Sequence, residues 1–163
     1  MAAGSTYTPI ATYTASGSQS VITFSSVPQT YTDLIIVSSV IWTTDGYINA
    51  MRFNSDSGNN YSYTRITGDG STAASSQLSN INYAFGGWTG VAPATNIIQI
   101  MNYSNSTTYK TSLVRTNVVG DRVVAYVNLW RNTAAITNIT LTHETSQNYT
   151  AGSTFTLYGI TAA

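Results

Sequence analysis

Short segments in which apolar and polar residues alternate recur from one end of the chain to the other. Gly, Asn, Asp, Ser and Pro separate these segments, as turn residues separate strands. No stretch places apolar residues at i, i+3, i+4 and i+7 over three turns, which is the spacing of an amphipathic helix. The pattern predicts about ten strands, near Tyr7–Tyr13, Ser20–Ser25, Thr32–Thr43, Tyr47–Asn54, Tyr61–Thr67, Asn96–Tyr103, Tyr109–Val119, Arg122–Trp130, Ile136–His143 and Ser153–Ile160.

So many short strands indicate an all-β protein, an antiparallel β-sandwich that is jelly-roll-like and has about 8 to 10 strands. The length of 163 residues is that of one domain, so we expect residues 1–163 to form a single β-sandwich domain. Residues 68–95 lack clear alternation and are rich in Gly, Ser and Ala. We expect them to form a long surface loop or excursion, which in a compact domain is usually functional or mobile.

Two predicted strands carry apolar residues on both faces, at Leu34–Trp42 and Val123–Trp130. A sandwich strand has one core face, so a loop, the chain's own terminus or another subunit must cover the second. Exposed apolar patches of this extent are rare on monomers, which favours another subunit. We therefore predict self-association through the second faces, which carry Ile35, Val37, Ile41, Val124, Tyr126 and Trp130.

Three aromatic residues, Tyr83, Phe85 and Trp88, lie within residues 68–95. Rigid aromatic side chains at a surface often anchor interfaces, so one interpretation makes this segment a partner-contact loop. The alternative is that the aromatic rings fold back and cap the open end of the sandwich. The sequence leaves both interpretations open.

Charged residues make up 7% of the chain and the formal net charge is +0. A neutral chain has no long-range field to attract phosphates or anionic lipid, so we expect neither nucleic acid nor a membrane surface as a partner. Little charge repulsion opposes contact between copies, which favours an oligomer. Met1–Ile10 lacks the basic and apolar regions of a signal peptide. The longest apolar stretch, Leu34–Trp42, is far shorter than the roughly 20 residues of a membrane span, so we expect a soluble product made in a cytoplasm.

The chain offers little for catalysis. It has no cysteine and one histidine, His143, followed by Glu144, and neighbouring residues of a strand point to opposite faces. We expect His143 to be structural, at a strand end where the imidazole reaches water, and no serine-nucleophile motif Gly-x-Ser-x-Gly is present. Most acidic residues adjoin turn residues, where Asp is expected for local hydrogen bonds. We predict no enzymatic activity and no cofactor.

One turn has the oxygen-rich composition of a cation loop. Asn54, Asp56 and Asn59 supply oxygen ligands at nearly alternate positions and could hold calcium. The segment lacks the bidentate glutamate and the regular spacing of an EF-hand. A hairpin loop without metal is the favoured interpretation.

Several phrases along the chain together resemble a group of small β-rich virion proteins of tailed phages, cyanophages among them: Ile10–Ser18, Ile22–Leu34, Arg52–Ser62, Trp130–Asn132 and Ala151–Ile160. The resemblance covers nearly the whole chain and is weakest at residues 68–95. It implies a jelly-roll-like capsid protein on the virion surface, a trimeric cement or decoration protein that binds the phage major capsid protein at local three-fold axes. The same group is similar to modules at the ends of head or tail fibres.

The leading hypothesis is therefore a homotrimer that stabilises the shell by binding adjacent major capsid subunits. Four arginines, Arg52, Arg65, Arg115 and Arg131, would donate bidentate hydrogen bonds to carboxylates or backbone of the shell. The rival hypothesis is a fibre module that binds host surface polysaccharide, with Tyr83, Phe85 and Trp88 stacked on sugar rings. Hydrolysis of a capsular glycan is the weakest option.

Overall fold

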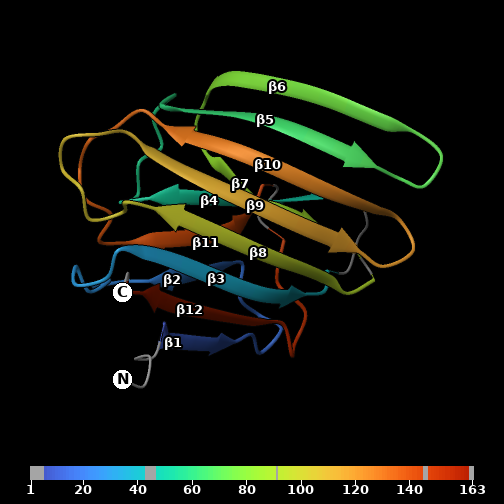
Figure 1. Cartoon of the computed structure of the whole chain (residues 1–163). Coiled ribbons are helices and arrows are strands. Elements are labelled where there is room, and N and C mark those ends of the chain that lie inside the picture. Colours follow the sequence, from blue (N-terminus) through green and yellow to red (C-terminus); the bar gives the residue numbers. More distant parts are fainter. Residues whose placement is uncertain (1–5, 43–46, 91, 145–146, 162–163) are drawn as a thin grey trace, which may run out of the picture.

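The computed structural model describes residues 6–42, 47–90, 92–144 and 147–161. These residues form twelve β-strands and no helix (Figure 1). Accordingly, the described part of the chain contains no helix long and apolar enough to cross a membrane. The predicted all-β class is confirmed, and the strands outnumber the 8 to 10 that we expected.

The strands form two antiparallel sheets, one of eight strands and one of four. The large sheet consists, in spatial order, of β1 (Tyr7–Thr14), β12 (Thr154–Ile160), β3 (Asp33–Val40), β8 (Ala94–Met101), β9 (Lys110–Val118), β10 (Arg122–Trp130), β5 (Tyr61–Gly68) and β6 (Ala73–Ile81). The small sheet consists of β2 (Val21–Phe24), β11 (Ile139–His143), β4 (Tyr47–Phe53) and β7 (Ala84–Thr89).

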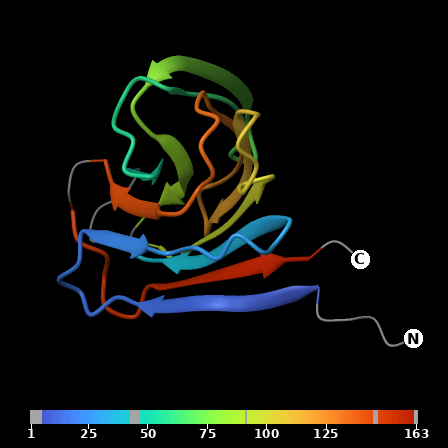
Figure 2. The same ribbon diagram turned by 90° about the vertical axis from the view of Figure 1, so that its left-hand side faces the viewer.

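The large sheet extends beyond the small one because two hairpins are added to it. Strands β5 and β6 pair with each other, strands β9 and β10 do the same, and both hairpins lie on the far side of β8. The sheet is strongly curved, and its β5–β6 end bends over β7 (Figure 2). We call the part of β5 and β6 that reaches past the edge of the small sheet the overhang.

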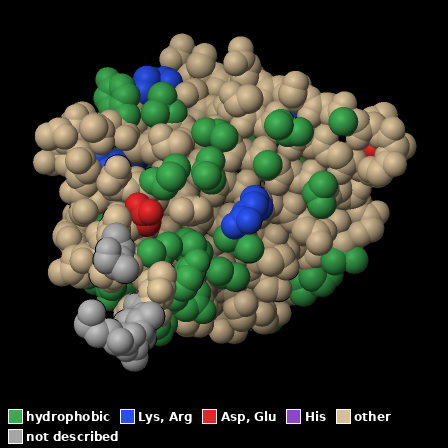
Figure 3. Space-filling view, viewed as in Figure 1, with side chains coloured by type: hydrophobic (Ala, Val, Ile, Leu, Met, Phe, Trp, Pro, Cys, Tyr) green, Lys and Arg blue, Asp and Glu red, His purple; other side chains and the backbone are tan. Residues whose placement is uncertain are grey.

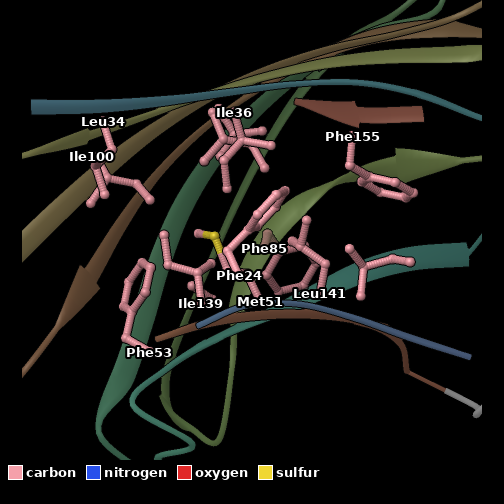
Figure 4. Packing of buried hydrophobic residues seen from close by; sticks show 14 of the residues in the cluster. Phe24, Leu34, Ile36, Met51, Phe53, Phe85, Ile100, Ile139, Leu141 and Phe155 are labelled. Atoms are coloured by element: carbon pink, nitrogen blue, oxygen red, sulfur yellow. The ribbon is translucent and has the colours of Figure 1, made fainter. Parts of the chain in front are cut away.

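The core lies between the two sheets, where each strand turns every second side chain inward. In β9 and β10 this alternation buries Val114, Tyr126 and Trp130 while their neighbours face outward. Side chains of the large sheet, such as Ile36 and Ile100, meet Met51, Ile139 and other residues of the small sheet (Figure 4). The period of two that predicted strands is therefore also the period that builds the core.

Residues 68–95 are not a surface loop, and our prediction of a long excursion is wrong. They end β5, form all of β6 and β7, and begin β8. Strand β6 shows no alternation because every residue in it is exposed or half-buried. Strand β7 shows none because its first four residues are all buried. A strand with both faces wet or both faces dry gives no periodic signal.

Strand β7 packs closely against the inner face of the large sheet, and this contact requires glycine. Gly87 has a φ of +120°, and a Cβ atom there would overlap the side chain of Asn96. A Cβ atom at Gly86 would lie 3.0 Å from the backbone oxygen of Asn49. The pair Gly86-Gly87 thus permits an approach that no larger residue would allow.

Buried polar side chains of the large sheet complete the backbone hydrogen bonds of β7. The amide N–H of Phe85 donates to Oδ1 of Asn128 at 3.0 Å, and Nδ2 of Asn128 donates to the Phe85 carbonyl at 3.1 Å. The amide N–H of Trp88 donates to Oγ1 of Thr116 at 3.1 Å. Side chains of the large sheet therefore bind the backbone groups on the open edge of β7, which a neighbouring strand would bind in a longer sheet.

Candidate functional site

The face of the large sheet that points away from the core carries five of the ten large apolar side chains that are exposed among the described residues. We call it the outer face and define it by Val37 of β3, Leu113 of β9, Val123 and Val127 of β10 and Ile66 of β5. Ile66 is 65% exposed, Val123 59% and Val127 50%. Hydrophobic side chains are spread across this face, with few charged ones between them (Figure 3). A surface of this composition is typical of an interface.

The outer face is hollowed where small residues replace large ones. Gly68, Ala73 and Ala125 lie among the linings of a hollow of about 780 Å³ that Ile66, Ile97 and Val123 also border. A second hollow of about 660 Å³ lies beside it, over Thr64, Gln77 and Val127. Both hollows are open depressions. They suit protruding side chains of another protein, whereas a small-molecule site would enclose most of its ligand.

The structure corrects half of the predicted self-association residues. Val124, Tyr126 and Trp130 are at most 4% exposed and belong to the chain's own core. Their opposite face, with Val123 and Val127, is the exposed one. The prediction failed because a period of two tells which residues share a face and not which face is inward, and both faces of this strand are apolar.

The residues predicted on the other strand point outward, but they are unequally accessible. Val37 is 38% exposed and belongs to the outer face. Ile35 is 8% exposed, because Tyr158 and Gln99 are its direct neighbours in the flanking strands. Ile41 is half-buried beyond the end of β3.

The three aromatic residues predicted to contact a partner are not on a free loop. Phe85 is 2% exposed and stacks on Tyr126 with ring centroids 5.0 Å apart. Tyr83 is half-buried, packs against Phe85 and donates from its hydroxyl to Oε2 of Glu144. Trp88 is also half-buried. The alternative interpretation, in which these rings fold back onto the body of the protein, is nearer to the structure.

Two arginines of the overhang region lie over the ring of Trp88. The guanidinium carbon of Arg122 is 4.9 Å from the ring centroid and that of Arg65 is 6.0 Å from it. Both arginines occupy the inward-facing register of their strands, and Arg65 pairs with Tyr126 across the β5–β10 ladder. The sequence contained one signal for this cluster: Arg65 shares the alternation of the buried Tyr61 and Tyr63.

The candidate calcium loop is closed by its own hydrogen bonds. Asp56 accepts from Nε1 of Trp130 at 2.7 Å, from Nδ2 of Asn60 at 2.9 Å and from the amide of Gly58 at 2.8 Å. Desolvation raises the pKa of Asp56, but these donors outweigh it and hold the pKa below its usual value. The side chain of Asn54 also has a partner within the protein, because its Nδ2 donates to the Ala135 carbonyl.

Asn59, the third predicted ligand, offers its backbone oxygen to Nη2 of Arg131 at 3.2 Å. Asp56 and Asn54 therefore point toward different partners and do not converge on one point. Within the described residues no three His, Cys, Asp or Glu side chains come together as metal ligands. The hydrogen bonds of Asp56 and Asn54 thus organise the loop as a turn.

His143 does not reach water, contrary to our expectation for a strand end. It is 2% exposed and meets the ring of Trp42 edge-on at a centroid distance of 4.3 Å. Burial lowers the pKa of His143, and the nearby Glu144 carboxylate only partly opposes this. Glu144 itself is exposed and accepts from Tyr83. His143 therefore lies in the core, while Glu144 lies at the surface.

No family model matches this chain, and neither a curated protein nor a solved structure is similar to it.

Proposed function

We propose that this protein is a structural subunit of a tailed-phage virion, a capsid cement or decoration protein that self-associates, as a trimer, through its outer face and stabilises the shell by binding adjacent major capsid subunits. The observation that carries the proposal is the outer face itself. The phage context rests on the resemblance of several sequence segments, Ile10–Ser18 and Ala151–Ile160 among them, to small β-rich virion proteins. The proposal includes no catalytic step and no cofactor.

The strand order supports a jelly roll as the framework. Leaving out the hairpins β5–β6 and β9–β10, we number the remaining strands one to eight along the chain. Their spatial orders are then 1-8-3-6 in the large sheet and 2-7-4-5 in the small one. This order is that of two interlocked Greek keys, the jelly roll that recurs in viral capsid and lectin domains. The two hairpins are then insertions that widen one sheet and enlarge the outer face.

A second copy of the chain is the occupant that best fits the outer face. Asp33 and Arg115, of opposite sign, have outward-facing positions in β3 and β9. A neighbouring copy that packs against this face therefore meets apolar surface and charges of both signs, and the chain has no net charge to oppose the contact. Eight strands about 4.8 Å apart and roughly 25 Å long offer on the order of 900 Å², close to the area per partner in a stable complex.

Self-association is tested by placing a charge on the outer face. We expect wild-type protein to sediment as an oligomer at micromolar concentration and the Val127→Asp and Ile66→Asp variants to sediment as monomers, because a buried carboxylate without a partner is costly. Thr23→Asp is the matched control, since Thr23 is exposed on β2 of the small sheet. Sedimentation equilibrium gives the mass and circular dichroism verifies the fold. A monomeric wild type, or a Val127→Asp variant that still assembles, would contradict the proposal.

A second candidate is the fibre module that binds host polysaccharide. Stacking of sugars on a loop that carries Tyr83, Phe85 and Trp88 is not supported, because Phe85 is buried. The observation that still favours a glycan is the pair of arginines at Trp88. These two arginines lie on a different part of the surface from the outer face.

A further inference from the structure

Trp88, Arg65 and Arg122 form a cluster on the concave side of the overhang, which we call the Trp88 site. Trp88 comes from β7 of the small sheet, while both arginines come from the large sheet, from β5 and β10. The large sheet curves over β7 at this end (Figure 2). The site therefore lies in the corner between the two sheets, on the opposite side of the large sheet from the outer face.

Polar atoms without a hydrogen-bond partner gather in this corner. Nε of Arg65, Nε1 of Trp88, Oγ of Ser76 and the hydroxyl of Tyr126 are each shielded from solvent, and none of these four atoms has a hydrogen-bond partner within standard distance and angle limits among the described residues. Arg65 and Ser76 are direct neighbours across the β5–β6 ladder. The Tyr126 hydroxyl lies opposite Arg65 and can accept from it, whereas the indole N–H of Trp88 can only donate and still needs an acceptor.

Arg122, the third residue of the Trp88 site, has a carboxylate partner at the surface. Arg122 pairs with Asp121 at 2.6 Å, and the two side chains are 35% and 36% exposed. The pair is bidentate, since Nη2 of Arg122 also donates to Oδ1 of Asp121 at 2.9 Å, but both side chains are open to water, which screens their attraction. Arg122 can exchange Asp121 for another carboxylate, and its movement would uncover the ring of Trp88, over which its guanidinium lies.

We propose that the Trp88 site binds an acidic saccharide, a sugar unit that carries a carboxylate such as a uronate. The carboxylate pairs with the guanidinium groups of Arg122 and Arg65, a geometry in which arginine forms bidentate hydrogen bonds. The ring of the sugar packs on Trp88, and its hydroxyl oxygens accept from Nε1 of Trp88 and Oγ of Ser76. This binding does not depend on self-association through the outer face.

The number and kinds of donors favour a saccharide over an acidic side chain of a protein. A glutamate or aspartate side chain brings a carboxylate alone, which two guanidinium groups satisfy. The indole N–H and the serine hydroxyl would still need neutral acceptors, and a sugar ring supplies them beside its carboxylate. Ser76 of β6, the direct neighbour of Arg65, is uncharged and polar, as suits a surface that meets hydroxyl groups.

The indole N–H resonances in a ¹⁵N-labelled sample report directly on this site. The chain has three tryptophans, and two of them are internal references, because Trp42 and Trp130 are each 1% exposed in the core. We expect glucuronate to shift the Trp88 indole resonance in a saturable way while glucose at the same concentration leaves it unchanged. Trp88→Phe assigns the resonance.

Arginine variants test the role of the charges. Arg65→Met and Arg122→Met should each weaken glucuronate binding at least tenfold, while Arg115→Met, on the outer face, should bind as the wild type does. Absence of a saturable shift, or equal binding by Arg65→Met, overturns the proposal. A short peptide of glutamates that binds more tightly than glucuronate also overturns it and assigns the site to an acidic protein partner. Because the readout is local, a monomeric wild type would overturn the proposed assembly without affecting this result.

Discussion

Lys110 illustrates how single polar residues hold this structure together from inside. It is the only lysine of the chain and is 1% exposed. Its Nζ donates to the carbonyl oxygens of Thr108 and Thr133 at 2.7 and 3.0 Å, and burial lowers its pKa. The lysine thereby links the start of β9 to the segment that follows β10. Sequence reasoning had no means of finding this role, because the partners are backbone carbonyls and not side chains.

His143 gives a prediction about pH. It is the only histidine, and burial lowers its pKa in the folded state from the ordinary 6.5. The unfolded chain therefore binds the proton more readily than the folded one, so stability should be constant above about pH 7 and fall as the pH drops below about 6.5. Each unit of pKa depression corresponds to about 1.4 kcal/mol of stability lost once the pH is well below both pKa values. Urea unfolding at pH 7.5, 6.5 and 5.5 measures this loss.

The control for this prediction is His143→Gln, which has no titrating ring. Whatever it does to stability at pH 7.5, its unfolding free energy should not change between pH 7.5 and 5.5. Carboxylates do not interfere, because unperturbed Asp and Glu titrate near pH 4. A wild type whose stability is flat across this range would contradict the assignment of His143 as a buried neutral side chain.

At the scale of strands, the sequence predicted those with one wet and one dry face. Ile139–His143 alternates buried and half-buried residues, as its sequence indicated. Strands β6 and β7 were missed for opposite reasons, since one is uncovered on both faces and the other is buried along most of its length. Their neighbourhood is set by long-range packing, in particular by the fit of Gly87 against Asn96. No local pattern encodes a contact of that kind.

The dependence of β7 on side-chain partners yields a second prediction. Asn128→Ala removes both hydrogen bonds to the Phe85 backbone and leaves a buried N–H and C=O unpaired. Each unsatisfied group costs about 1 to 3 kcal/mol, so for the two groups we expect a loss of roughly 2 to 6 kcal/mol in unfolding free energy. The amide of Phe85 should also exchange its hydrogen faster.

The matched control is Asn117→Ala, because Asn117 is an exposed asparagine on the neighbouring strand β9. Surface substitutions of this kind usually change stability by less than about 0.5 kcal/mol. Equal effects of the two substitutions in urea unfolding would show that Asn128 does not support β7.

For the whole molecule, the sequence predicted two layers of antiparallel strands and an apolar surface beyond the core. It did not predict which face of β10 would be that surface. The choice depends on where the small sheet lies, since β7 covers the side of Tyr126 and Asn128 and leaves Val123 and Val127 open. The Trp88 site was missed for the same reason, because its residues come from β5, β7 and β10 and meet only through the curvature of the large sheet.

The proposed virion role is tested at the scale of a particle. If assembled copies bridge capsid subunits, particles that lack this protein should release their DNA at a lower temperature than complete particles, because the bridging contacts must break before the shell opens. Supplying Thr23→Asp protein should restore the wild-type release temperature, whereas Val127→Asp protein, folded but unable to self-associate, should not. A fluorescent DNA dye followed during heating measures the release. Particles without the protein that open at the same temperature as complete ones would exclude the cement role, and restoration by Val127→Asp would separate shell binding from self-association.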